Sequence, residues 1–376
     1  MPLLGLYLHV PFCRSKCLYC DFCYFPNRGE EQYRAYTDAL CRDLTARAEE
    51  CRRYEVDTVY LGGGTPTVLP IKCLSKILDT VSANYAVTRD AEITVECNPV
   101  TGSATLFEAL RRAGINRLSL GVQSVHADEL RALGRLHRLS DVENTLRDAR
   151  AAGFENISVD VMFGIPHQSV ERYLETLERL VALEPTHLSA YGLTVEEKTP
   201  FGRMGERLVL PDEEETRRMY FLGAEFLERK GYRQYEISNF AKEGYASRHN
   251  LKYWSCEEYL GFGPAAYSDF GGKRFGNSRD LDAYLAGRPI LSECETPSGE
   301  ERKNEYVMLR MRTAQGVRTD DYARRFGTSF EADFGQRLER YAGGGFVRRT
   351  QDGWAFTREG MYVSNAILSE ILEFGN

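Results

Sequence analysis

The chain of 376 residues is 43% hydrophobic and carries a net charge of −7, and this length allows about two or three domains with cores of their own. Acidic and basic residues are mixed along the chain, which excludes broad electrostatic capture of nucleic acid. No apolar stretch approaches the roughly 20 residues that span a bilayer, and the first ten residues lack the basic region and cleavage site of a secretory leader, so we expect a cytoplasmic protein without a transmembrane segment.

Six β-rich runs recur in the first two hundred residues and alternate with segments of helical spacing. This alternation predicts an α/β fold of six βα units with a parallel sheet. Six units make a partial (β/α)6 TIM-like barrel, although an open doubly wound sheet would show the same alternation. The predicted strands are 6–10, 58–62, 93–97, 117–122, 157–164 and 187–193. In either arrangement the chemistry belongs at the carboxyl ends of the strands.

The pattern changes after residue 202. One predicted helix over 210–231 is followed by an aromatic and glycine-rich region without a sustained period. Farther on, a predicted hairpin over 346–357 has an Asp-Gly turn and precedes a final helix over 358–374. This order predicts a smaller α+β region that ends in a winged-helix-like tail. The predicted domains are a core barrel over 1–205, an accessory region over 206–300 and a C-terminal module over 301–376.

Four of the ten cysteines, Cys13, Cys17, Cys20 and Cys23, stand within eleven residues directly after the first predicted strand. Structural zinc usually takes two ligand pairs separated by a longer loop, and outside this run no CxxC or HxxxH is present. A bacterial ferredoxin has another order of spacings. Accidental clustering of structural thiols leaves the spacing without a reason. The other six cysteines are scattered singly, as expected for reduced thiols.

The order Cys-x3-Cys-x2-Cys after a strand resembles the signature of the radical SAM superfamily. Within it, the chain resembles the HemN/HemW family over nearly its whole length. The resemblance implies a [4Fe-4S] cluster on Cys13, Cys17 and Cys20, with one iron open to the amino and carboxylate groups of S-adenosylmethionine. It leaves Cys23 off the cluster, because a fourth thiolate would close that iron. The motifs that carry the resemblance are YLHVPFCRSKCLYCDF, GGGTPT, ECNP, RLSLGVQS, LGRLH, VDVMFGIP and YEISNFAKEGYASRHNLKYW.

The resemblance also implies contacts to S-adenosylmethionine, carried over position by position. Glycines let backbone approach a ligand closely, although a strand-to-helix turn favours glycine in any case. Polar side chains can hold the ribose hydroxyls, the methionine ammonium and carboxylate, and the adenine. Singly, each could be a surface or capping residue, but they fall on successive βα units. The implied contacts are Tyr7, Tyr19, Gly63, Gly64, Thr65, Glu96, Gln123, Arg135, Asp160 and Gly192.

Two departures disfavour the coproporphyrinogen III dehydrogenases of the family. Those enzymes carry a cysteine where this chain has Phe22, and they have a longer segment ahead of the cysteines. The run from His249 to Trp254, HNLKYW, resembles the HNxxYW motif associated with haem, and imidazole is a common axial ligand of haem iron. A lone histidine among aromatic residues is also often structural, and Tyr267 stands where relatives often have a histidine.

The resemblance therefore implies a HemW-like haem chaperone that binds a [4Fe-4S] cluster, S-adenosylmethionine and haem. The implied partners are haem-accepting apoproteins, membrane-associated ones included, and an electron donor for the cluster. Two alternatives stay open at this point. One is an oxygen-independent coproporphyrinogen III dehydrogenase, which decarboxylates propionates by radical chemistry. The other is a HemN-like radical SAM methyltransferase or cyclopropanase.

Overall fold

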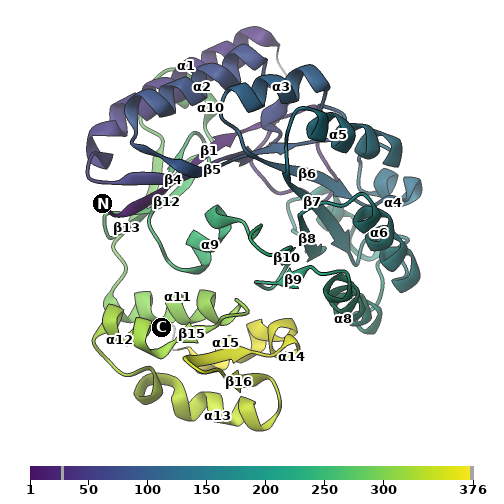
Figure 1. The fold of residues 1–376 in the computed structure, drawn as a ribbon, viewed down its shortest axis with the longest axis vertical. Coiled ribbons are helices and arrows are strands. Elements are labelled where there is room, and N and C mark those ends of the chain that lie inside the picture. The colour runs from purple at the N-terminus through teal and green to yellow at the C-terminus, as the bar shows by residue number, and fades with distance from the viewer. Residues whose placement is uncertain (27–28, 373–376) are drawn as a thin grey trace.

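The computed structural model describes residues 1–26 and 29–372 and places a large curved sheet above a smaller C-terminal module (Figure 1). Twelve strands of the described residues form this sheet, and its central six run parallel in chain order. The six are β1 (Leu3–Val10), β4 (Glu55–Gly63), β5 (Val87–Cys97), β6 (Arg117–Gln123), β7 (Asn156–Phe163) and β8 (His187–Gly192). The six predicted strands and the partial (β/α)6 barrel are therefore confirmed.

Helices cover the outer, convex face of the sheet (Figure 1). Alternate strand residues such as Leu6, Leu8, Val59 and Leu61 are fully buried in the core that these helices share. The intervening residues face the barrel interior. Because helices cover one face of the sheet and the barrel interior encloses the other, most strand residues do not face solvent. The covering helices are α1 (Glu30–Arg47), α2 (Ile71–Asn84), α3 (Ala104–Arg112), α4 (Ala127–Ala132), α5 (Leu139–Ala151), α6 (Val170–Ala182) and α8 (Glu213–Arg229).

Short strands that the sequence did not indicate extend the sheet at both ends. They are two to five residues long, which is too short to produce a sustained hydrophobic period. Beside β1 lie β11 (Tyr259–Phe262), β12 (Tyr267–Phe270), β13 (Lys273–Asn277) and β14 (Leu291–Glu295), and beside β8 lie β10 (Asn239–Ala241) and β9 (Arg233–Gln234). Strands from both sides of residue 205 thus share one sheet, and the domain boundaries at 205 and 300 stay predictions.

Helix α9 (Arg248–Trp254) lies on the concave side of the sheet (Figure 1). Its first backbone N–H groups, from Arg248 and His249, donate to the Glu92 carboxylate of β5, each at 3.0 Å. This carboxylate complements the positive end of the helix. Farther along α9, the buried Lys252 ammonium lies 2.8 Å from Asp57 of β4. These contacts bind α9 to the sheet inside the barrel.

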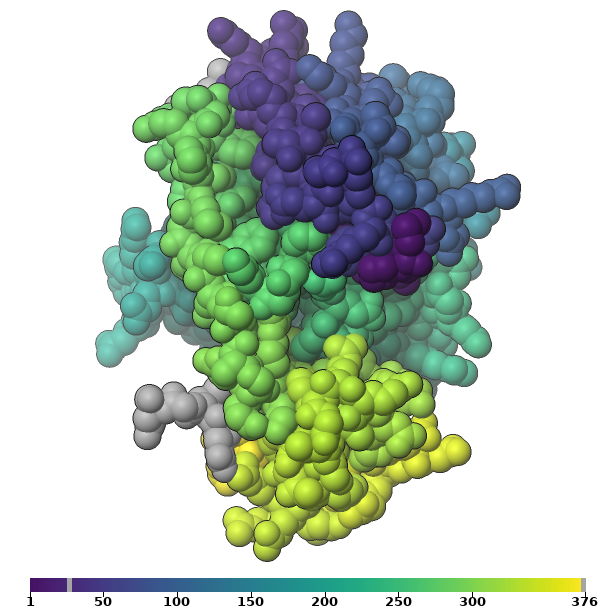
Figure 2. All heavy atoms as spheres, turned by 90° about the vertical axis from the view of Figure 1, so that its left-hand side faces the viewer, coloured from purple at the N-terminus to yellow at the C-terminus, as the bar shows by residue number. Residues whose placement is uncertain are grey.

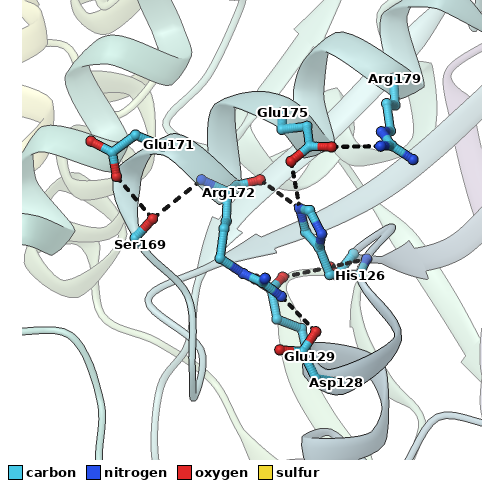
Figure 3. Close-up of polar contacts among 9 residues, drawn as sticks. His126, Asp128, Glu129, Ser169, Glu171, Arg172, Glu175 and Arg179 are labelled. Carbon is cyan, nitrogen blue, oxygen red and sulfur yellow. Dashed lines mark hydrogen bonds and ion pairs between the residues drawn. The ribbon is translucent and has the colours of Figure 1, made fainter.

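An ionic network on the outer surface fixes the loop after β6 (Figure 3). Arg172 of α6 donates to Glu129 of α4 at 2.7 Å and to Asp128 at 2.5 Å. The Ser124 hydroxyl donates to Glu129, and the His126 ring lies 3.1 Å from the Arg172 carbonyl oxygen. Because Glu129 is fully buried, breaking its pair with Arg172 would leave an uncompensated charge. The network therefore holds α4 and the residues after it in place.

The C-terminal module has a hydrophobic core of its own around Trp354 and lies below the barrel (Figure 2). The predicted hairpin is confirmed as β16 (Val347–Arg349) and β17 (Gly353–Phe356), which form a three-stranded sheet with β15 (Val317–Arg318). The predicted final helix over 358–374 is wrong in its continuity, because it is interrupted at Val363, and its last two residues lie outside the described residues. The module's helices are α11 (Gly299–Met311), α12 (Thr319–Phe326), α13 (Gln336–Gly343), α14 (Arg358–Tyr362) and α15 (Ser364–Ile371).

None of the described helices combines the length and the apolar composition that crossing a bilayer requires.

Candidate functional site

Cys13, Cys17 and Cys20 line one cavity at the carboxyl ends of the central strands, which we call the cysteine cavity. The Thr65 hydroxyl lies 3.7 Å from the Cys13 sulfur, and the Arg135 guanidinium donates to the Cys17 sulfur at 3.4 Å. Burial raises the pKa of the Cys13 thiol to about 11. The Cys13 thiol would therefore stay protonated until a metal displaces its proton.

The donor set fits an iron-sulfur cluster better than a single ion. Among residues 1–26 and 29–372, no three His, Cys, Asp or Glu side chains converge on one ion position. A [4Fe-4S] cluster takes its thiolates on separate irons, so it does not require such convergence. Three thiols in one cavity, two of them already contacted by a hydroxyl and a guanidinium, match the part of the cluster that a protein supplies.

Cys23 lies in an adjacent cavity of about 600 Å³, which we call the aromatic cavity because Tyr7, Tyr253, Tyr259 and Tyr267 are among its lining residues. Cys23 is 6% exposed and does not line the cysteine cavity. The structure thus separates the fourth cysteine of the run from the other three.

Packing within the protein explains why the turn at Gly63 and Gly64 has glycines. Gly63 has a φ of +100°, and a Cβ there would lie 2.5 Å from the His9 ring. A Cβ on Gly64 would lie 2.6 Å from the Phe12 carbonyl oxygen. Close approach of a ligand, the reason inferred from the sequence, is therefore not needed to account for these glycines.

Four predicted polar contacts from successive βα units also line the cysteine cavity, namely Glu96, Gln123, Arg135 and Asp160. Glu96 accepts hydrogen bonds from the Tyr60 hydroxyl at 2.9 Å and from the Gly63 N–H at 3.1 Å. Burial raises the pKa of Glu96 to about 7 and that of Asp160 to about 6. The parallel strands thus bring these groups to one edge of the sheet, as predicted.

The remaining predicted contacts divide between cavities. Thr65 and Tyr19 line the cysteine cavity. Tyr7 lines the aromatic cavity, and its hydroxyl lies 3.0 Å from Nδ1 of His9. Gly192 lines a third cavity, which Tyr19 shares. Tyr7 and Gly192 are therefore not in the wall of the cavity that holds the three thiols.

His249 lies inside the barrel, where it is 1% exposed and stacks on the Tyr60 ring at 5.2 Å between centroids. Its Nδ1 lies 2.8 Å from the Thr58 hydroxyl and its Nε2 lies 2.8 Å from the Tyr253 hydroxyl. Burial lowers the pKa of His249 to about 3, so the ring is neutral at pH 7. Both ring nitrogens are engaged, and access to Nε2 from the aromatic cavity requires Tyr253 to move.

The third cavity, of about 700 Å³, lies inside the barrel and was missed by the sequence reading. We call it the barrel cavity. Its signal is an alternation within strands, because polar Arg117 and Ser119 alternate with buried Leu118 and Leu120. One such run also fits a half-exposed strand, so the alternation alone does not indicate an interior cavity. Other lining residues are Tyr60, Ser158, His187, Ser189, Asn239 and Asn250.

The chain is similar to known proteins over nearly its whole length. Residues 7–180 match the model of the radical SAM superfamily, and residues 298–363 match that of the HemN C-terminal domain. The haem chaperone HemW of Bacillus subtilis is 36% identical, with 97% of this chain and 98% of that protein covered. HemW of Escherichia coli is 34% identical, with 99% of each covered.

A solved structure has the same fold. Coproporphyrinogen III oxidase (HemN) from Escherichia coli, a radical SAM enzyme, superimposes with a TM-score of 0.86 and 23% sequence identity. The match covers 99% of this chain and 90% of that one. At this identity the likeness extends to the fold alone.

The raised pKa of Glu96 predicts how stability depends on pH. The folded protein binds the carboxyl proton more tightly than the unfolded chain does, so stability falls as pH rises from about 4.5 to about 7. In cluster-free protein, we expect Glu96→Gln to remove about 2–3 kcal/mol of the loss in unfolding free energy between pH 5 and 7.5. Urea unfolding followed by circular dichroism measures this, with the exposed Glu155→Gln as control. Equal losses in wild type and Glu96→Gln would contradict it.

Proposed function

Because the chain belongs to the HemW family of the radical SAM superfamily, we propose that it is a haem chaperone that delivers haem to acceptor proteins. The observation that carries the proposal is the similarity to haem chaperones over the full length of both chains. The likeness to coproporphyrinogen III oxidase concerns the fold and favours no decarboxylase activity. We also propose that the protein acts in the cytoplasm and that an electron donor reduces its cluster.

We assign the [4Fe-4S] cluster to Cys13, Cys17 and Cys20. Their shared cavity supports this, as do the contacts of Thr65 and Arg135 to two of the sulfurs. When bound, such a cluster supplies an open iron that S-adenosylmethionine can chelate. The position of Cys23 in another cavity supports its exclusion from the ligand set.

The S-adenosylmethionine contacts follow from the same cavity. We assign directed hydrogen bonds to Glu96, Gln123, Arg135 and Asp160, because their polar groups line the cavity beside the thiols. Thr65 and Tyr19 complete its wall, and the turn at Gly63 and Gly64 shapes it. Tyr7 and Gly192 stay predictions, since they line neighbouring cavities.

For haem we propose the aromatic cavity. Its volume of about 600 Å³ and its tyrosine rings suit a flat macrocycle. His249 then acts as axial ligand through Nε2 once the Tyr253 hydroxyl, at 2.8 Å, has turned away. Tyr253 itself lines the cavity, so a bound macrocycle would contact the residue that covers the imidazole.

The cluster assignment predicts different outcomes for cysteines of one run. After anaerobic reconstitution, we expect Cys13→Ser, Cys17→Ser and Cys20→Ser to lose most of their bound iron and sulfide. Cys23→Ser, the matched control from the same loop, should retain both, and its reduced cluster should still change its electron paramagnetic resonance spectrum when S-adenosylmethionine is added. Iron loss in Cys23→Ser equal to that in Cys13→Ser would make Cys23 a ligand instead.

The haem assignment predicts opposite shifts for two neighbouring side chains. We expect His249→Ala to weaken haem binding at least about tenfold, because a coordinate bond is lost. Tyr253→Phe should tighten it roughly twofold to tenfold, because Nε2 no longer gives up a hydrogen bond. Spectrophotometric haem titration measures both, with Tyr259→Phe from the same cavity as control.

The haem chaperone function is tested by measuring haem transfer from the loaded protein to an apoprotein. The alternative is tested by measuring coproporphyrinogen III turnover in parallel. Unchanged affinity in His249→Ala would remove this residue from the haem site. Formation of vinyl groups in stoichiometric yield would overturn the chaperone function.

A further inference from the structure

Among the residues that the structure describes, the buried Arg117 guanidinium has no hydrogen-bond or ion-pair partner. It stands at the first position of β6, faces the barrel interior and is 2% exposed. Its Nε atom is buried without an acceptor, and within residues 1–26 and 29–372 no carboxylate lies within ion-pair distance of its guanidinium. An unmatched buried guanidinium is costly, so such a group calls for an acceptor that the chain itself does not supply.

Four carboxylates line the same cavity, and the two that interact with the charge of Arg117, Glu96 and Asp160, are occupied with other donors. Glu96 accepts from Tyr60 and from the Gly63 N–H, and Asp160 accepts from the Ser119 hydroxyl at 3.3 Å. Burial raises the pKa of Asp160, and the nearby charge of Arg117 only partly opposes that rise. The N–H groups of Arg117 therefore remain free to bind something in the cavity.

The cavity beside Arg117 is large enough for an organic molecule. It measures about 700 Å³, and Ser158, Ser189 and Asn239 also line it. The Asn239 side-chain oxygen is buried without a donor, which adds a second unmatched polar atom to the wall. The unmatched guanidinium indicates a ligand that carries an anionic group, and the unmatched oxygen adds to the polar lining of the cavity.

The position of the cavity relates it to the proposed chemistry. Ser119 and Asp160 line both the barrel cavity and the cysteine cavity, so the two adjoin. Phe22 and Arg279 line both the barrel cavity and the aromatic cavity. A ligand seated in the aromatic cavity can thus extend a side arm into the barrel, beside the place of S-adenosylmethionine.

We propose that Arg117 binds a carboxylate of the ligand, through the paired N–H groups that match the two carboxylate oxygens. The carboxylate site stands on the unpartnered guanidinium and the cavity. Its identification as a haem propionate site rests on the proposed function.

The first experiment tests the anion site without haem, in full-length ¹⁵N-labelled protein with its cluster reconstituted. The Nε–Hε signal of Arg117 is identified by its absence from Arg117→Lys. We expect sodium propionate to shift this signal in a saturable way, while sodium chloride at equal ionic strength and neutral propionamide do not. A signal that does not move, or that moves equally with chloride or propionamide, would overturn the carboxylate site.

The same titration with S-adenosylmethionine present shows whether the site is separate. We expect the propionate shift to persist. Its abolition would place Arg117 in the S-adenosylmethionine site and overturn the proposal.

The second experiment compares haem with its dimethyl ester, which lacks free carboxylates. We expect wild type to bind haem about tenfold to a hundredfold more tightly than the ester, and Arg117→Gln to lose most of this preference. Arg112→Gln removes one exposed charge from α3 as the matched control and should keep the preference. Circular dichroism checks that each variant folds. The comparison of haem with its ester on the wild-type protein does not depend on any variant.

The outcomes separate the two proposals. A saturable propionate shift without any haem binding would refute the haem chaperone while the carboxylate site stands. If Arg117→Gln binds haem and keeps the full preference for haem over its dimethyl ester, the propionate assignment is refuted while the chaperone stands.

Discussion

The site depends on one close contact between two loops, in which the turn after β4 lies directly on the backbone after β1. Gly64 N–H donates to the Val10 carbonyl at 2.9 Å and Thr65 N–H to the Phe12 carbonyl at 2.7 Å. No side chain fits between them, because a Cβ on Gly64 would meet the Phe12 oxygen. The contact sets where Cys13 begins its loop, and the Gly63 N–H bond to Glu96 joins the end of β5 to it.

The barrel interior is polar because a helix, rather than apolar side chains, fills part of it. Glu92 and Asp57 are used to bind α9, and Thr58 is used to hold His249. The layer beside them keeps titratable groups in a cavity, with carboxyl pKa values raised by burial. Buried groups of this kind lower stability, and proteins retain them mostly where function requires them.

The sequence was sufficient for the parts of the fold that repeat and for the parts that belong to a motif. Six long buried strands produce a clear period, and the matched motifs select three cysteines and four polar residues that line one cavity. Their roles as ligands stay predictions. The role of α9 was not predictable, because seven residues with one histidine fit a ligand and a packed core residue equally well. The sequence also could not predict which cavity Tyr7 lines, because that depends on how side chains divide the barrel interior into separate cavities. Arg117 was missed because the absence of a partner is visible only in three dimensions.

The division of the interior makes β1 the wall between two proposed ligands. Tyr7 and His9 of β1 face the aromatic cavity, while Cys13, just beyond the strand, faces the cysteine cavity. The His9 ring bridges the two sides: Nδ1 lies 3.0 Å from the Tyr7 hydroxyl, and the ring fills the space where Gly63 would carry a Cβ. The His9 ring therefore packs against both Tyr7, in the wall of the aromatic cavity, and the turn whose Gly63 N–H donates to Glu96 in the cysteine cavity. Because protein interiors are close-packed, one side chain thus sets the spacing between the walls of the two cavities.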